Sequence, residues 1–217
     1  MKKIFIPLIV IATMTVAFTT GPADEIKTIS TGTRLPMPAH KMKDVTGRDV
    51  ALQDLKGENG LLVVFSCNTC PFVIGNDEDN AGWEGRYNEV ADSALKHKIG
   101  MVLVNSNEAK RDAGDSFDDM VKRYTEKGFK CRYVLDTASV MANAFGAKTT
   151  PHVFLFDKNL QLVYRGAIDD NVRVPGEVKD HYLFNVMADV TAGKKPRIEE
   201  TKPVGCSIKR VAVTKTK

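Results

Sequence analysis

The chain has 217 residues, of which 43% are hydrophobic and 27% are charged. These proportions are ordinary for a globular protein and exclude disordered and collagen-like chains, and four cysteines are too few for a disulfide-dense scaffold. The net charge of +4 divides into +2 for residues 1–23, +6 for residues 194–217 and −4 for residues 24–193. The body therefore lacks the clustered basic face of a nucleic-acid binder.

The N-terminal segment has the layout of a secretory signal peptide. Lys2 and Lys3 precede 15 uncharged residues, 4–18, and small and polar residues follow up to Ala23. The apolar run is shorter than the about 20 residues that a membrane-spanning helix needs, although an uncleaved membrane anchor stays open as an alternative. We expect a signal peptide at 1–23 and an exported protein, periplasmic or secreted, in a compartment where disulfides persist.

The remaining chain reads as one domain, 24–193, and a basic C-terminal tail, 194–217, which we interpret as a solvated extension. Apolar runs typical of buried strands lie at 61–65, 99–104, 133–135, 153–156 and 160–164. Apolar residues at helical spacing lie at 83–95, 117–124, 140–145 and 182–190. This alternation predicts an α/β fold with a central mixed sheet flanked by helices, parallel in its first part and ending in an antiparallel hairpin.

A pair of cysteines, Cys67 and Cys70, follows the first buried strand and directly precedes Pro71. Two cysteines at this spacing at the start of a helix can close a small disulfide ring. Pro71 suits the first helical turn, where its absent N–H is not needed. We expect the free N–H groups of the helix to lower the pKa of Cys67 and make it a nucleophile. A C-x-x-C pair alone is also compatible with half of a zinc site.

A threonine–proline junction, Thr150-Pro151, lies just before the predicted hairpin and is a candidate cis-proline. Strand, C-x-x-C, helix, Thr-Pro and hairpin in this order resemble the thioredoxin fold. The closer similarity is to extracytoplasmic thioredoxin-like proteins of the AhpC/TSA-redoxin group, over about residues 33–210. The motifs that carry it lie at 65–71, 105–107, 150–157, 164–170 and 203–209.

The resemblance implies a thiol–disulfide oxidoreductase that uses Cys67 and Cys70 on protein disulfides, with no cofactor. Thr150, Pro151, Asn68 and Thr69 would contact the partner, and an electron donor or acceptor would complete the cycle. The sequence departs from thioredoxins proper in three ways. Ser66 stands where an aromatic residue precedes the first cysteine, Leu61 replaces a buried acid, and Asn68 and Thr69 replace Gly-Pro.

Two other chemistries stay open. A peroxiredoxin-like peroxidase would need a hydroxyl three residues before its cysteine, but Val64 holds that position for Cys67, and Cys67 holds it for Cys70. A copper-binding or copper-delivery protein would combine the two thiolates with His152, which directly follows the candidate cis-proline. Alternatively, His152 points into packing or solvent.

The other two cysteines have no role that the sequence decides. Cys206 lies in the motif at 203–209 and is a resolving thiol for Cys67 or Cys70 or a tether for the tail. Cys131 is a half-buried free cysteine or pairs with Cys206 in a structural disulfide. Near the site, residues 75–82 are expected to interrupt the helix after Pro71. Asp169 and Asp170 contact the rim of the site or cap the last helix.

Overall fold

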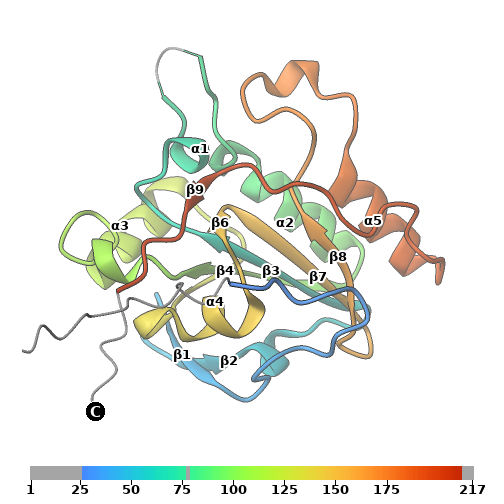
Figure 1. The fold of residues 1–217 in the computed structure, drawn as a ribbon, viewed down its shortest axis with the longest axis horizontal. Helices are drawn as coiled ribbons and strands as arrows, with labels where there is room; N and C mark the ends of the chain where they lie inside the picture. The colour runs from blue at the N-terminus through green and yellow to red at the C-terminus, as the bar shows by residue number, and fades with distance from the viewer. Residues whose placement is uncertain (1–25, 77–78, 212–217) are drawn as a thin grey trace, which may run out of the picture.

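The computed structural model describes residues 26–76 and 79–211, which form a mixed seven-stranded sheet with helices on both faces (Figure 1). The strands of this sheet, in the order β2-β1-β5-β4-β3-β7-β8, are β2 Asp49–Ala51, β1 Lys41–Asp44, β5 Arg132–Leu135, β4 Ile99–Asn105, β3 Gly60–Ser66, β7 His152–Asp157 and β8 Leu162–Gly166. The helices are α1 Pro71–Ile74, α2 Tyr87–Lys96, α3 Phe117–Lys127, α4 Val140–Phe145 and α5 Tyr182–Thr191. A second, two-stranded sheet joins β6 Thr149–Thr150 to β9 Cys206–Ser207.

The strand directions agree with the sequence prediction. β3, β4 and β5 run parallel, whereas β7 is antiparallel to β3 and forms a hairpin with β8. Asp157 shapes the hairpin turn, because its Oδ1 accepts the backbone N–H groups of Asn159 and Gln161, both at 2.9 Å. The predicted α/β class with a mixed central sheet is confirmed.

The core lies on both faces of β3, all seven residues of which are buried. Leu62 and Val64 face a cluster that includes residues of α2 and α5, whereas Leu61, Val63 and Phe65 face a cluster that includes α4. Full burial of each such side chain stabilises the fold by about 1.5–3 kcal/mol. The covering of both faces explains why β3 is a continuous apolar run and carries no polar alternation.

Capping signals set the limits of α3. Ser116 accepts the N–H of Asp119 at 3.0 Å, and the Asp119 carboxylate accepts the N–H of Ser116 at 3.1 Å, which is a capping box. The helix ends at Gly128, whose φ of +57° is in the left-handed region that glycine tolerates. The helix therefore begins two residues after Asp115, which contributes to the site.

Two parts of the fold differ from the prediction. The sequence did not indicate β1 and β2, which pair antiparallel and place β1 beside β5. Residues 194–211 are not a solvated extension: Thr201 bonds the backbone of Arg165, and Ile208 is buried in the α4 core. Figure 1 shows this red segment running from α5 to β9 beside α1.

The N-terminal prediction cannot be placed on this fold, because the signal peptide at 1–23 lies outside the described residues. Within 26–76 and 79–211, none of the helices is both long and apolar enough to span a membrane.

Candidate active site

The two cysteines Cys67 and Cys70 occupy the turn between β3 and α1. Helix α1 begins at Pro71, so that Cys70 is its N-cap residue. The expected place of Pro71 in the first helical turn is confirmed, and the N–H of Phe72 in that turn faces Cys70. Both cysteines are buried, with 2% of Cys67 and 3% of Cys70 exposed.

The predicted threonine–proline junction meets this turn. The Thr150–Pro151 peptide bond is cis, as predicted. Thr150 Oγ1 lies 3.2 Å from Cys67 Sγ, and the protonated Cys70 donates to Thr150 O at 3.3 Å. Thr150, which follows Cys70 by 80 residues in the sequence, therefore contacts the sulfur atoms of both cysteines.

The surroundings favour the thiolate of Cys70 over that of Cys67. The pKa of Cys70 is lowered to about 5, first because the Cys67 thiol donates to it, and then through the thiol and N–H of Cys206 and the N–H of Phe72. The pKa of Cys67 is raised by that same bond to Cys70, by burial and by the charge of Asp115. The prediction that Cys67 has the lowered pKa stays a prediction, because one shared hydrogen bond is the largest cause of both pKa shifts. The further N–H donors, from Cys206 and Phe72, converge on Cys70.

Asn68 and Thr69, predicted to contact a partner, direct their polar groups inward. The N–H of Asn68 and the hydroxyl of Thr69 donate to the two carboxylate oxygens of Asp115, each at 2.7 Å. The Asn68 side chain also accepts from Tyr133 Oη at 2.9 Å and donates to Gly114 O at 3.1 Å. These bonds hold the loop between the cysteines in one conformation.

Asp115 is a site residue that the sequence analysis did not identify. It is completely buried, and the side chains of Asn105 and Asn107 also donate to it, at 2.8 and 3.1 Å. The four hydrogen bonds that this carboxylate accepts compensate for the free-energy cost of removing it from water. Asn105 and Asn107 belong to the motif at 105–107. This motif is the feature of the sequence that could have indicated a buried polar centre here.

Cys206 contacts Cys70, not Cys131. The N–H of Cys206 donates to Cys70 Sγ at 3.3 Å, and Cys206 pairs with Thr150 across the two-stranded sheet. Cys131 precedes the start of β5, about five residues, or about 16 Å, along the strands from the level of Cys67. Cys131 and Cys206 do not form the structural disulfide that the sequence left open. Cys131 is a buried free cysteine.

His152 does not join the cysteines. Its ring packs on Phe154 at 4.4 Å, and its Nδ1 accepts the N–H of Lys148. Burial lowers its pKa to about 3, which keeps the ring neutral. In the described part of the chain, no three His, Cys, Asp or Glu side chains form a group that could hold a metal ion. The proposed copper set of Cys67, Cys70 and His152 is therefore wrong.

Two further expectations concerned an interrupted helix after Pro71, and Asp169 and Asp170 as rim residues or helix caps. Helix α1 stops at Ile74, and Gly75 has a φ of +82°, so the predicted interruption is confirmed. Asp169 is buried and pairs with the buried Arg86. Asp170 accepts the N–H of Lys179 at 3.0 Å. Neither aspartate caps α5, whose N-cap residue is His181.

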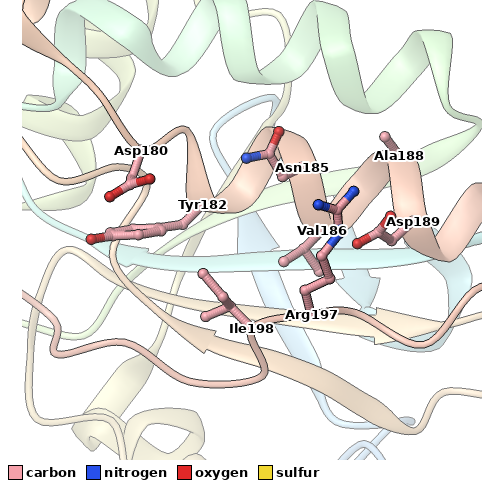
Figure 2. A pocket seen from close by; sticks show the side chains of 8 residues that line it. All are labelled: Asp180, Tyr182, Asn185, Val186, Ala188, Asp189, Arg197 and Ile198. Carbon is pink, nitrogen blue, oxygen red and sulfur yellow. The ribbon is translucent and has the colours of Figure 1, made fainter.

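A pocket of about 350 Å³ lies apart from the cysteines, between α5 and the segment that follows it (Figure 2). Tyr182 and Asp189 of α5 line one side, and Arg197 and Ile198 line the other. None of the residues that line this pocket is a cysteine, so the pocket is not part of the thiol site.

Comparisons with known proteins agree with this geometry. The Redoxin family model matches residues 31–181. An uncharacterized conserved protein from Geobacillus kaustophilus is 27% identical, with a TM-score of 0.75 over 85% of this chain and 94% of that chain. A hypothetical protein from Sinorhizobium meliloti 1021 is 28% identical, with a TM-score of 0.74 over 86% and 97%. No curated protein matches the chain.

More distant structures agree in fold alone. The Xanthomonas campestris bacterioferritin comigratory protein is 16% identical, with a TM-score of 0.52 over 76% of this chain and 99% of that chain. A thioredoxin-like protein in the oxidized form is 19% identical, with a TM-score of 0.52 over 74% and 97%. The predicted thioredoxin-like fold is confirmed.

Proposed function

Because the chain belongs to the Redoxin family and holds Cys67 and Cys70 together after β3, we propose that it is a thiol–disulfide oxidoreductase acting on protein disulfides. Family and fold support thiol-based redox activity. The observation that carries the finer proposal is the position of Cys70, whose sulfur accepts the N–H of Cys206 at 3.3 Å and lies beside the thiol of Cys67. A stabilised thiolate next to a second thiol is the arrangement that disulfide exchange requires.

In the proposed reaction, Cys70 attacks first and Cys67 completes the exchange. The Cys70 thiolate forms a bond to one sulfur of the partner disulfide, and the other partner sulfur leaves as a thiolate and takes up a proton. Cys67 then loses its proton and attacks Cys70 Sγ. The Cys67–Cys70 disulfide forms and the second partner thiol is released. The partner gains two electrons and two protons; the cysteine pair supplies both electrons and the proton of Cys67, and solvent supplies the other proton.

The same contacts control the order of these steps. While Cys70 is a thiolate, Cys67 is held protonated by its bond to Cys70. The mixed disulfide removes that negative charge, so one cause of the raised Cys67 pKa disappears. The Thr150 hydroxyl, 3.2 Å from Cys67 Sγ, is then a donor for the new thiolate. Thr150 is thereby a positioning residue for both steps.

The test is insulin reduction by the full chain with dithiothreitol as electron source. We expect Cys70→Ser to lower turnover by at least about a hundredfold, because the attacking thiolate is gone. Cys67→Ser lowers turnover as well. Cys131→Ala, a change at a buried cysteine away from the site, is the matched control and keeps turnover. A Cys70→Ser protein with full activity would overturn the proposal.

Two further measurements decide the direction of electron flow and whether the protein reduces peroxides. A reduction potential of the pair near about −270 mV makes the protein a reductase, and one near about −120 mV makes it an oxidase. Peroxide consumption by the reduced protein tests the peroxidase alternative. We do not favour that alternative, because Val64 and Cys67 hold the positions three residues before Cys67 and Cys70, where a peroxidase would need a hydroxyl.

The proposed setting is outside the cytosol. The segment 1–23 supports export as a signal peptide, and the partners would be protein disulfides with a separate electron donor or acceptor. Fractionation of expressing cells and N-terminal sequencing test this. A mature periplasmic or secreted chain is expected, an uncleaved membrane-bound chain indicates the anchor, and a full-length cytosolic chain refutes export.

A further inference from the structure

The C-terminal segment holds a third thiol against the cysteine pair. Cys206 lies in β9, which pairs with β6 in the register Thr150↔Cys206 and Thr149↔Ser207. Its N–H donates to Cys70 Sγ at 3.3 Å. Cys206 is half-exposed, whereas Cys67 and Cys70 are almost fully buried. The sulfur atoms of Cys67, Cys70 and Cys206 therefore lie near the backbone of Thr150. The most exposed of the three cysteines, Cys206, belongs to the C-terminal segment.

The segment is fixed there by contacts on both sides of Cys206. Trp83 Nε1 donates to Val204 O at 3.2 Å before it. After it, the N–H of Ile208 donates to Lys148 O at 3.0 Å, and Lys209 bonds Asn107 Oδ1 at 3.0 Å. Such anchoring gives the Cys206 thiol a high effective concentration at Cys70.

Glycine is required at one point of this approach. A Cβ on Gly205 would stand 2.2 Å from Thr150 O and 3.0 Å from Pro151 N, both of them backbone atoms that cannot yield. The absence of a side chain at Gly205 lets the segment reach the Thr150 edge and bring Cys206 to Cys70. Cys206 is thus placed at Cys70 by the backbone, not by its own side chain alone.

From this juxtaposition, and resting on the proposed function, we infer that Cys206 is a third redox thiol that exchanges with Cys70. The Cys206 thiolate attacks Cys70 Sγ of the oxidised Cys67–Cys70 pair. The Cys70–Cys206 bond forms, the Cys67–Cys70 bond breaks, and the proton released by Cys206 ends on Cys67. Electrons balance within the three thiols, so no added oxidant is needed.

The exchange has two consequences for the site. In the reduced protein, burial and the neighbouring Cys70 thiolate raise the pKa of Cys206 to about 11, so it stays protonated. Oxidation of the pair removes that thiolate and favours attack by Cys206. The Cys70–Cys206 disulfide then ties β9 to the N-terminus of α1 and leaves Cys67 as a free thiol.

Disulfide mapping by mass spectrometry tests this inference on the full chain, independently of insulin turnover. Cys67→Ser protein is oxidised in millimolar oxidised glutathione, digested without reduction and mapped. We expect a Cys70–Cys206 crosslink to exceed the Cys70–glutathione adduct by at least about tenfold. Adding Cys206→Ser should reverse this ratio, and adding Cys131→Ala should not change it.

Two outcomes overturn the inference. One is a Cys67→Ser protein in which Cys70 carries glutathione and Cys206 stays free; the other is an oxidised wild-type protein that contains only Cys67–Cys70. Thermal unfolding of each variant shows that it is folded when mapped. If insulin reduction fails while the Cys70–Cys206 crosslink forms, the proposed substrate is wrong and the third thiol stands.

Discussion

The lowered pKa of Cys70 is the most direct consequence of the site geometry. With a pKa of about 5, Cys70 is about 99% thiolate at pH 7, whereas an ordinary cysteine with a pKa of about 8.5 is about 3% thiolate. The difference is about thirtyfold in reactive species. The thiols of Cys131 and Cys206 stay protonated at neutral pH, because burial raises the pKa of Cys131 to about 12 and that of Cys206 to about 11.

Alkylation of the reduced protein by iodoacetamide, followed by peptide mapping at each pH, measures this thiolate. We expect Cys70 labelling to reach its plateau above a midpoint near pH 5. Cys67→Ala removes the first-named donor and should move the midpoint upward, whereas Cys67→Ser keeps a hydroxyl donor and should move it less. A midpoint of 8 or above for Cys70 in the wild-type protein, or an acidic transition that survives Cys70→Ser, would refute the reasoning.

Other predictions concern stability. The pKa of Cys70 is lower in the folded protein than in the unfolded chain. Its ionisation therefore stabilises the reduced protein fully above about pH 8.5, and this contribution to the free energy of unfolding is lost as pH falls toward 5. Denaturant titrations of wild type and Cys70→Ser isolate the contribution. Asp115→Asn turns an amide N–H₂ toward two donors and should cost about 3 kcal/mol in urea unfolding, with slower insulin reduction. Arg86→Met leaves the Asp169 carboxylate buried and unpaired, so we expect a loss of about 3–5 kcal/mol, smaller when Asp169→Asn is added; equal losses would contradict this. Phe145→Ala opens a cavity among edge-to-face rings and should lower the free energy of unfolding by about 3–5 kcal/mol, measured by chemical denaturation.

The central elements were predictable because their patterns are local. β3 and β7 are covered on both faces, so each is a continuous apolar run in the sequence. β1 alternates Lys, Met, Lys and Asp over four residues, with only Met42 and Asp44 buried, and such a short alternating segment gives little signal. Its place beside β5 depends on pairing with distant residues, which local composition does not encode.

The site was predictable in part for the same reason. The cysteine spacing and the Thr150-Pro151 junction are local motifs, and the structure brings them together. Asp115 lies in a polar segment 45 residues beyond Cys70, and its role follows only from the packing of β4 and α3 around it. The segment around Cys206 is rich in lysine and arginine, which favours a solvated tail by composition, yet its contacts are with backbone atoms of Thr150 and Lys148.

One contribution to the lowered pKa of Cys70 follows from Pro71. A proline has no N–H and a fixed φ, so it fits the first position of a helix and makes the residue before it the N-cap. That residue is Cys70, and α1 begins one position later. The N–H of Phe72 is consequently free for the Cys70 sulfur. Cys67, three residues earlier, lies outside the helix and beside the Asp115 carboxylate, which opposes ionisation. The position of Pro71 therefore supports the proposed attack by Cys70, with Cys67 and Cys206 as the thiols that would resolve its disulfides.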